Sequence, residues 1–572
     1  MDPLAMLTSL LRKSPAGDRV ILELDLDHSV LSNAPANPLE AFRLINAPTM
    51  RALRDGLAEA AADPAVAGLI VHLGTCPISA SQCCELADLI AGFAEHKPVW
   101  AYTESFGEFS GGLLPYTLAA HAEQVWLQPS GELGLGGLRA QITLLRGVFD
   151  KVGLEPQFGQ RKEYKTAADT YAAHEISPAN TEMMQQIVNS ITHWAVDTIA
   201  QRRGRSAEQV WASVDAGMLT AEQAREHGLI DRIGYRDEVY AEARRAWAGE
   251  TASLRFVHRY SKVSAAKELV QARLKPAVAM VEVRGGIVTG RPPRQGGGQP
   301  VAASEVVCQQ LRAAAADDQV KAVVLRVDSP GGSYIASDAI RREVLRLRES
   351  GRPVVACMGD VAASGGYFVA MPADEIVAQP TTLTGSIGVL AGKFVSTGIK
   401  EKLGLVMSDV TAGAWASFMS PNSRFSDEQW AALDRRLDDI YADFTGKAAA
   451  DRGMALDVLE PLAHGRVWTG LDAKQRGLID HLGGMGTAID RACALAGLRR
   501  DEVAARAVSM LGFLKQLRPA ESSESVSGAV TFAPARLDLD TLIADAASRL
   551  GLTAHGVLSL PFAIRLDGGL GG

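Results

Sequence analysis

The feature that most constrains this fold is an internal repeat with a period of about 250 residues. Three pairs of similar segments occur in the same order in the two halves: 63–73 with 317–327, 97–101 with 352–356, and 227–234 with 476–483. The partners start 254, 255 and 249 positions apart. Offsets this similar predict that one domain of about 230 residues has been duplicated.

Both copies have the sequence rhythm of an α/β domain. Each opens with an apolar run rich in β-branched residues, at 19–24 and at 277–283. Helical patterns then alternate with short apolar runs such as 322–327 and 353–357, which is typical of βαβ units. The predicted fold is therefore α/β, with parallel sheets and packed helices in two tandem domains.

The repeat divides the 572 residues into five parts. We expect an N-terminal segment (1–18), an N-terminal α/β repeat (19–254), a connecting segment (255–276), a C-terminal α/β repeat (277–500) and a C-terminal extension (501–572). The sequence of the C-terminal extension does not indicate a chemical role.

Three shorter segments have compositions of their own. Residues 290–300 are too rich in Gly and Pro for a regular element and predict a loop. Residues 521–527 are rich in Ser and Glu and predict a linker, whereas 537–550 predicts a terminal amphipathic helix.

Composition and charge exclude several classes of protein. With 47% hydrophobic and 22% charged residues, the chain fits an ordinary folded protein and not a disordered or disulfide-scaffold one. The net charge of −8, without a long basic run, argues against a nucleic-acid partner. The six cysteines form no CxxC pair, and the histidines are not spaced around them as zinc ligands would be. We therefore expect reduced thiols and no metal centre.

The N-terminal segment does not resemble a secretory signal. Its apolar stretch, within 1–11, is preceded by Asp2 and followed by Arg12 and Lys13, which reverses the order of a signal peptide. No run approaches the roughly 18 apolar residues that span a bilayer. The sequence predicts a cytoplasmic protein, or one that contacts the cell membrane peripherally through residues 1–13 or the tail.

The two copies differ at a turn that follows a strand. The C-terminal copy has DSPGG at 328–332, whereas the N-terminal copy has GTCP at 74–77. Paired glycines at such a turn can bring backbone N–H groups close to a ligand, as an oxyanion hole requires. Taken alone, the same residues also fit an ordinary tight turn.

A serine follows the next strand of the C-terminal copy. Ser364 lies among small residues near the start of a predicted helix, where its hydroxyl is open to a substrate and negative charge is favoured. The N-terminal copy has its own Ser-Gly-Gly, beginning at Ser110, and this tripeptide is also a common helix cap. Because the N-terminal copy lacks the turn found at 328–332, Ser364 is the stronger candidate.

A second serine and a lysine also occur in one copy only. Ser386 is matched by Leu135 in the N-terminal copy, while Lys165 is matched by Ala416 in the C-terminal copy. Most lysines are solvated surface groups. A buried lysine, however, can lose its proton and act as the base that activates a serine, and Ser386 could orient the amine.

The histidines offer a Ser-His-Asp arrangement as an alternative, but none has a catalytic sequence context. His72 lies inside a predicted strand and fits a packed histidine, whereas His464 and His481 fit surface residues. The sequence has no HExxH, no P-loop and no GxGxxG after a strand, which leaves metal, nucleotide and dinucleotide sites without support.

Five motifs together resemble the signal peptide peptidase A (protease IV) family in its long, duplicated form: 163–167 (EYKTA), 328–332 (DSPGG), 363–367 (ASGGY), 384–389 (TGSIGV) and 465–470 (GRVWTG). The resemblance covers both copies, residues 19–500. It implies Clp protease/crotonase-like domains and a Ser/Lys endopeptidase that degrades apolar peptides such as cleaved signal peptides.

The same resemblance implies a role for each motif residue. Ser364 would be the nucleophile, Lys165 the general base, and Ser386 the residue that orients the lysine. The oxyanion N–H groups would come from Gly331, Gly332 and Gly365. No metal or organic cofactor is implied.

The resemblance also implies partners. Long-form relatives assemble as tetramers with a hydrophobic interior, so we expect a homotetramer that takes peptide substrates. Such relatives commonly have an N-terminal membrane anchor, which is not visible here. Two other functions remain open: a crotonase-like acyl-CoA enzyme, although paired catalytic Glu residues are lacking, and a non-catalytic membrane-associated oligomeric scaffold.

Overall fold

The computed structural model describes residues 19–31, 47–108, 111–260, 275–291, 300–507 and 558–559. Several sequence expectations fall wholly or mainly outside the described residues: the segment 1–18, the loop at 290–300, the linker at 521–527 and the helix at 537–550. Ser110 also lies outside them.

Contacts divide the chain into two compact units. The described residues of the first unit fall within 19–139 and 192–260, and those of the second within 140–191 and 275–559. The repeat assigns 140–191 to the N-terminal copy, yet these residues group by their contacts with the second unit. Lys165 therefore lies in one compact unit with Ser364 and Ser386. The domain boundaries drawn from the repeat stay a prediction.

The first unit is built on a six-stranded parallel sheet in the order β8-β4-β3-β2-β1-β9. Its strands are β1 (Val20–Asp25), β2 (Val66–His72), β3 (Val99–Thr103), β4 (Gln124–Leu127), β8 (Arg232–Ile233) and β9 (Ser253–Phe256). On one face, Ile70 and Trp126 pack in a cluster with Val239 of α11 (Arg236–Ala243). Strands covered by helices in this way are apolar along most of their length.

The other elements of the first unit are α3 (Met50–Ala62), α4 (Ala80–Ala94), α5 (Leu113–Ala119), β5 (Glu132–Gly134), α9 (Ala207–Ala216), β7 (Met218–Thr220) and α10 (Ala221–Glu226). Helix α8 (Pro178–Arg203) begins in the second unit and ends in the first.

The second unit is built on an eight-stranded sheet with a main path of β19-β17-β15-β13-β10-β21, and with β16 and β20 branching from β15. Its strands are β10 (Ala277–Arg284), β13 (Val320–Ser329), β15 (Val354–Ala363), β16 (Glu375–Ala378), β17 (Leu383–Gly385), β19 (Val467–Thr469), β20 (His481–Leu482) and β21 (Ala504–Ala507). All pairs are parallel except β17 with β19.

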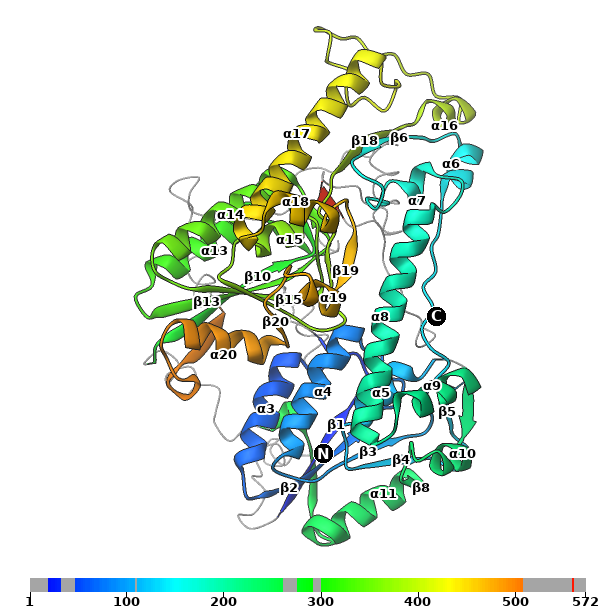
Figure 1. Cartoon of the computed structure of the whole chain (residues 1–572), viewed down its shortest axis with the longest axis vertical. Helices are drawn as coiled ribbons and strands as arrows, with labels where there is room; N and C mark the ends of the chain where they lie inside the picture. The colour runs from blue at the N-terminus through cyan, green and yellow to red at the C-terminus, as the bar shows by residue number, and fades with distance from the viewer. Residues whose placement is uncertain are drawn as a thin grey trace, which may run out of the picture. The chain divides into compact units, whose positions relative to one another are not determined.

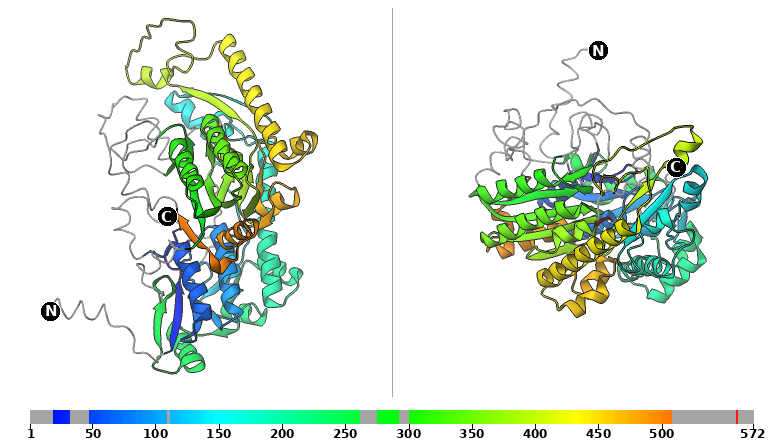
Figure 2. Two further views of the ribbon diagram at one scale, coloured as in Figure 1. Left: turned by 90° about the vertical axis from the view of Figure 1, so that its left-hand side faces the viewer. Right: turned by 90° about the horizontal axis from the view of Figure 1, so that it is seen from above.

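Helices cover both faces of this second sheet. Ala279 and Val281 of β10 lie in one hydrophobic cluster with residues of α13 (Ser304–Ala316) and α14 (Tyr334–Glu349), two helices that lie side by side in Figure 1 and Figure 2. The alternate residue Val278 packs on the opposite face, in a cluster with α20 (Met485–Leu495). Because successive strand residues point to opposite faces, burial on both faces requires the uninterrupted apolar runs that the sequence shows.

Two smaller sheets complete the second unit. Strand β6 (Glu155–Gln160) pairs antiparallel with β18 (Leu390–Val395), which ties the 140–191 segment to the C-terminal repeat. The other sheet has the order β12-β11-β14-β22. Its strands are β11 (Gly286–Val288), β12 (Val301–Ala303), β14 (Gly331–Gly332) and β22 (Leu558–Ser559).

The remaining helices of the second unit are α6 (Arg146–Val152), α7 (Asp169–Ala172), α15 (Gly365–Ala370), α16 (Thr397–Lys402), α17 (Asp427–Arg452), α18 (Leu456–Leu459) and α19 (Gly470–Gln475). Among the described residues, no helix is both long enough and apolar enough to cross a membrane.

The predicted α/β class is confirmed. The apolar runs at 19–24 and 277–283 form β1 and β10, and those at 322–327 and 353–357 lie in β13 and β15.

Candidate active site

Ser364 lies at the sharp junction between β15 and α15. Its backbone has φ +55° and ψ −114°, a conformation that non-glycine residues rarely adopt and that is found most often at functional sites. The Ser364 N–H donates to the Gly385 carbonyl at 2.8 Å. The side chain of Ser364 is completely buried.

The two glycines after Ser364 allow this junction to pack closely on the turn at 329–332. A Cβ at Gly365 would lie 3.1 Å from the Gly331 Cα, and one at Gly366 would lie 2.5 Å from the Ser329 carbonyl oxygen. Any larger residue would push the two segments apart. The close packing therefore places the backbone of the paired glycines directly beside the serine.

Lys165 reaches the serine from the segment between β6 and α7. Its Nζ lies 2.8 Å from Ser364 Oγ, 3.0 Å from Ser386 Oγ and 3.1 Å from the Ser386 carbonyl oxygen. All three oxygens are uncharged, and the lysine side chain is completely buried. This burial lowers the pKa of Lys165 well below its usual value, because desolvation penalises the ammonium form.

A glycine of the 465–470 motif makes room for the lysine backbone. Gly465 has φ +78°, and a Cβ there would lie 2.5 Å from the Lys165 N and 2.6 Å from its Cα. The Gly465 N–H donates to the Ile387 carbonyl at 2.7 Å, and the Tyr164 N–H donates to the His464 carbonyl at 3.1 Å. The segments that contain Lys165, Ser386 and Gly465 are thus joined by their backbones.

Arg466 makes an ion pair and contacts two aromatic rings beside the Lys165 segment. Arg466 Nη1 lies 2.8 Å from Glu182 Oε1 on α8, and its guanidinium lies 4.6 Å from the Tyr164 ring centre and 4.7 Å from that of Trp468. Tyr164 Oη donates to Glu182 at 2.9 Å. Tyr164, Arg466 and Trp468 lie inside motifs already noted in the sequence, but Glu182 and its contacts were not predicted, since no local pattern links Glu182 to Arg466.

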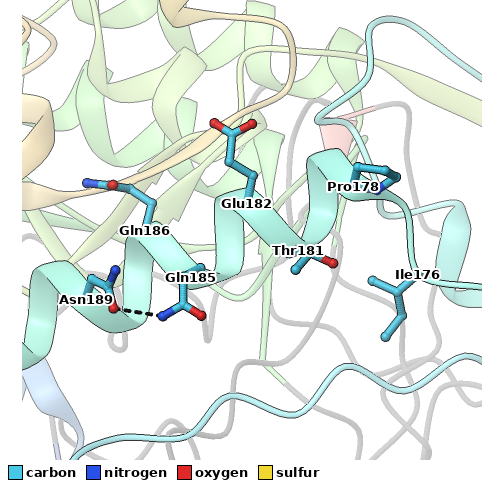
Figure 3. A pocket seen from close by; sticks show the side chains of 7 residues that line it. All are labelled: Ile176, Pro178, Thr181, Glu182, Gln185, Gln186 and Asn189. Atoms are coloured by element: carbon cyan, nitrogen blue, oxygen red, sulfur yellow. Dashed lines mark hydrogen bonds between the residues drawn. The ribbon is translucent and has the colours of Figure 1, made fainter.

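Helix α8 also borders a surface pocket of about 610 Å³. Figure 3 shows its lining side chains along α8 and the preceding segment: Ile176, Pro178, Thr181, Glu182, Gln185, Gln186 and Asn189. Gln186 Nε2 lies 3.3 Å from the Asp472 carboxylate. The pocket lies along α8 and the residues before it. None of the six predicted site residues (Lys165, Gly331, Gly332, Ser364, Gly365 and Ser386) lines it.

The paired glycines form the short strand β14. Gly331 and Gly332 have φ values of +107° and +152°, which only glycine adopts readily. The Gly331 N–H donates to Ser329 Oγ at 3.2 Å, and Ser329 Oγ donates to the Gly285 carbonyl at 2.7 Å. Gly331 could therefore donate to an oxyanion only by sharing or giving up that bond.

The aspartate of the DSPGG motif has a structural contact. Asp328 Oδ1 accepts a hydrogen bond from the Val361 N–H at 3.3 Å, which links the end of β13 to the strand that leads to Ser364. Burial raises the pKa of Asp328, and the nearby Asp360 adds to this effect.

The three histidines considered from the sequence have carboxylate partners. His72 is buried in the first unit, with Nδ1 3.0 Å from Asp25 Oδ1 and Nε2 3.0 Å from Glu104 Oε2, as a packed histidine would be. The side chain of His464 is partly exposed, and its Nδ1 lies 3.0 Å from Glu163 Oε1, beside the lysine segment. His481 lies 3.2 Å from Glu375.

The chain matches known protein families in both repeats. The family described as peptidase family S49 matches residues 91–248 and 346–499, and the Clp protease family matches residues 298–382. The S49 match covers more than half of the chain.

Three curated relatives are similar over most of the chain. They are "Serine protease SPPA, chloroplastic" from Arabidopsis thaliana (33% identical, covering 76% of this chain and 64% of the relative), "Protease 4" from Salmonella typhi (30%, 71% and 65%) and "Protease 4" from Haemophilus influenzae (28%, 77% and 72%). The chain spans just under two thirds of the length of the first two. The family model matches once in each half of the chain, in agreement with the duplication. This chain therefore belongs to peptidase family S49.

Proposed function

We propose that this chain is a serine-type endopeptidase in which Ser364 is the nucleophile and Lys165 the general base. The observation that carries the proposal is the 2.8 Å separation of Lys165 Nζ from Ser364 Oγ, between two completely buried side chains. Burial favours the neutral amine, whose lone pair can accept the serine proton. The two oxygens of Ser386 accept the N–H bonds that aim this lone pair at Ser364.

The reaction follows from these contacts. Ser364 Oγ bonds to the carbonyl carbon of the peptide while its proton passes to Lys165 Nζ, and the carbonyl electron pair moves onto the oxygen. Backbone N–H groups of Gly365 and Gly332 stabilise this oxyanion, together with Gly331 if its bond to Ser329 is released. The C–N bond then breaks as Lys165 returns the proton to the leaving amine, which forms an acyl-enzyme. Water then bonds to the acyl carbon as it gives a proton to Lys165. The C–Oγ bond breaks, Lys165 returns that proton to Ser364 Oγ, and the peptide's new carboxyl group leaves.

The substrates we propose are apolar peptides such as cleaved signal peptides. Two relatives are named "Protease 4" and a third "Serine protease SPPA", and the motifs that hold Ser364, Lys165 and Ser386 are those that resemble this family.

We further propose that copies of this chain assemble, as a homotetramer, through an apolar segment of the second unit. Seven large apolar side chains are exposed between residues 403 and 419: Leu403, Leu405, Val406, Met407, Val410, Trp415 and Met419. Val406 and Val410 are 95% and 99% exposed. A run of this kind is a typical protein interaction surface, and burial between copies would remove it from water.

Cleavage of a fluorogenic apolar peptide tests the proposed function. Ser364→Ala and Lys165→Ala should each lower kcat/KM by at least about 10³-fold, because the reaction loses its nucleophile or its base. Ser110→Ala, in the Ser-Gly-Gly of the other copy, is the control and should stay within about twofold of wild type. An inactive but correctly folded wild type, or activity that survives either site change, would overturn the proposal.

A further inference from the structure

Two residues with strained backbones flank the buried lysine. Lys162 has φ +70° and His464 has φ +50°, values that residues other than glycine rarely adopt. The Lys162 carbonyl accepts a hydrogen bond from the Lys165 N–H at 3.4 Å. His464 directly precedes Gly465, the glycine that packs on the Lys165 backbone. Strained conformations of this kind persist only where the surrounding contacts hold them, and they cluster at active sites.

A chain of charged contacts joins these two residues. His464 Nδ1 lies 3.0 Å from Glu163 Oε1, and its Nε2 lies 3.5 Å from Glu460 Oε1, which belongs to a 3₁₀ turn. Glu460 Oε1 also lies 3.1 Å from Lys162 Nζ. Tyr441 of α17 donates to Glu460 at 3.0 Å, and its ring centre lies 5.5 Å from Lys162 Nζ. The charged and titratable groups near His464 thus come from the lysine segment, the 3₁₀ turn and α17.

The geometry favours a charged His464. Each of its ring nitrogens faces a carboxylate, so a neutral imidazole would present its lone pair to one of them. Desolvation raises the pKa of Glu163, but its own backbone N–H, the hydrogen bond with His464 and the charges of His464 and Lys162 lower the pKa overall. A single exposed ion pair contributes little, whereas charges joined in a network contribute more. The contacts therefore tie the turn before Lys165 to the turn before Gly465.

We propose that His464 is a positioning residue for Lys165, acting through its two carboxylate partners. The inference rests on the proposed function for the role of Lys165 as the base. The effect passes through the backbone, because the Tyr164 N–H donates to the His464 carbonyl at 3.1 Å and Gly465 packs on the Lys165 N and Cα. Loss of the ion pairs would let the lysine segment move and admit water to Nζ. The lowered pKa of Lys165 would then rise towards its usual value.

Replacement of His464 by glycine separates positioning from folding. Glycine adopts a positive φ freely, so His464→Gly removes the ion pairs without adding strain, and its Tm should stay within about 2 °C of wild type. Its kcat/KM for the fluorogenic peptide should fall at least about tenfold, mainly in kcat, since small displacements of a catalytic group are costly. The pH below which protonation of Lys165 lowers the rate should rise by at least about half a unit. A His464→Gly protein with the kcat/KM and pH profile of wild type would overturn the inference.

His464→Arg is the conservative variant that should restore the rate. A guanidinium stays charged and can donate to both carboxylates, so kcat/KM should lie within about threefold of wild type although the strained φ is kept. The control is His481→Gly, which removes another histidine–carboxylate contact of the same unit, 3.2 Å from Glu375, and should leave kcat/KM within about twofold. An arginine variant as slow as His464→Gly, or an equal loss in His481→Gly, would contradict the role given to His464.

A measurement that needs no peptidase activity separates this inference from the proposed function. The difference in Tm between the chain with Lys165 and its Lys165→Met counterpart should increase from pH 7 to 10, because burial keeps the lysine neutral in the folded state. In the His464→Gly background this increase should be no more than about half as large. An equal increase in both backgrounds would overturn the inference. If the increase is smaller but the wild type cleaves no peptide, the proposed function fails and the placement of Lys165 by His464 stands.

Discussion

At the scale of single residues, the proposed chemistry depends on where Lys165 is buried. Its Nζ has three oxygen partners, none of which carries a charge, and desolvation alone lowers its pKa. A carboxylate at this position would instead hold the lysine as an ammonium ion, which cannot accept a proton. Because these partners carry no charge, nothing offsets the desolvation that favours the neutral amine, the form that can act as a base.

The pH dependence of the rate follows from this lowered pKa. As pH falls through the lowered pKa of Lys165, the amine becomes protonated and the base is lost. The kcat/KM for the fluorogenic peptide should therefore show an acid limb with a slope of about one, flattening at higher pH. A rate that rises as pH falls would contradict the assignment of Lys165 as the base.

The same burial predicts an effect on stability. The pKa of Lys165 is lowered in the folded chain and lies near the free-lysine value of 10.5 in the unfolded chain. At pH values between these two, the unfolded chain binds more protons at Lys165 than the folded chain does. The stability of wild type relative to Lys165→Met should therefore increase as pH rises from 7 to 10, seen as a shift in the Tm difference of about 2 °C or more.

Lys447 provides a matched control for this measurement. Desolvation lowers the pKa of Lys447, but hydrogen bonds to Asp338 and Asp443 outweigh it and raise the pKa overall. Its change of charge thus occurs above pH 10, and the Tm difference between wild type and Lys447→Met should be nearly constant from pH 7 to 10. A Lys165 difference equally insensitive to pH would mean that the buried lysine is not neutral.

At the scale of structural elements, the site depends on how closely the lysine segment packs on the 465–470 motif. Gly465 has φ +78° with no room for a Cβ beside Lys165, whereas Gly453, which ends α17, has φ +61° with open space around it. Both glycines therefore have a positive φ, but only Gly465 has backbone atoms of another segment close to it.

This contrast predicts different outcomes for two similar substitutions. Gly465→Ala should displace the Lys165 backbone and lower kcat/KM by about 10²-fold or more, since small displacements of catalytic groups are costly. Gly453→Ala should cost about 1 kcal/mol of stability from the same positive φ while activity is retained. Equal activities in the two variants, measured beside their thermal unfolding, would show that the Gly465 contact does not position the lysine.

The long elements could be predicted from the sequence, and so could the residues of the proposed dyad, but not the contacts around them. Long apolar runs such as 322–327 are visible because a strand buried on both faces must be apolar throughout. Lys165 and Ser386 were visible because each is present in only one copy of the repeat, and Ser364 because only its copy has the glycine turn at 328–332. By contrast, the link from Glu182 to Arg466 joins positions 284 residues apart and leaves no local pattern. Strands β14 and β22 have two residues each, too few for any periodicity.

At the scale of the whole molecule, the proposed assembly would bury the exposed segment at 403–419 between copies. Val406→Glu combined with Val410→Glu would place charges on two nearly fully exposed apolar positions, which disfavours their burial between copies. Sedimentation velocity should show the loss of the wild-type assembly in favour of smaller species.

An exposed valine elsewhere in the same unit serves as the control. Val458 is 54% exposed on α18, and Val458→Glu should leave the sedimentation profile unchanged. An assembly that survives the change at Val406 and Val410, or one that is lost with Val458→Glu, would mean that copies associate through another surface.

The most direct test of the central claim is the site of covalent labelling by a serine-directed fluorophosphonate. Peptide mapping by mass spectrometry should find one adduct on Ser364 in the wild type. In folded Lys165→Met protein the labelling rate should fall by at least about 10²-fold, because the serine has lost its base. An adduct on Ser110 in place of Ser364, or labelling of Ser364 at an unchanged rate without Lys165, would contradict the assignment of this Ser/Lys pair.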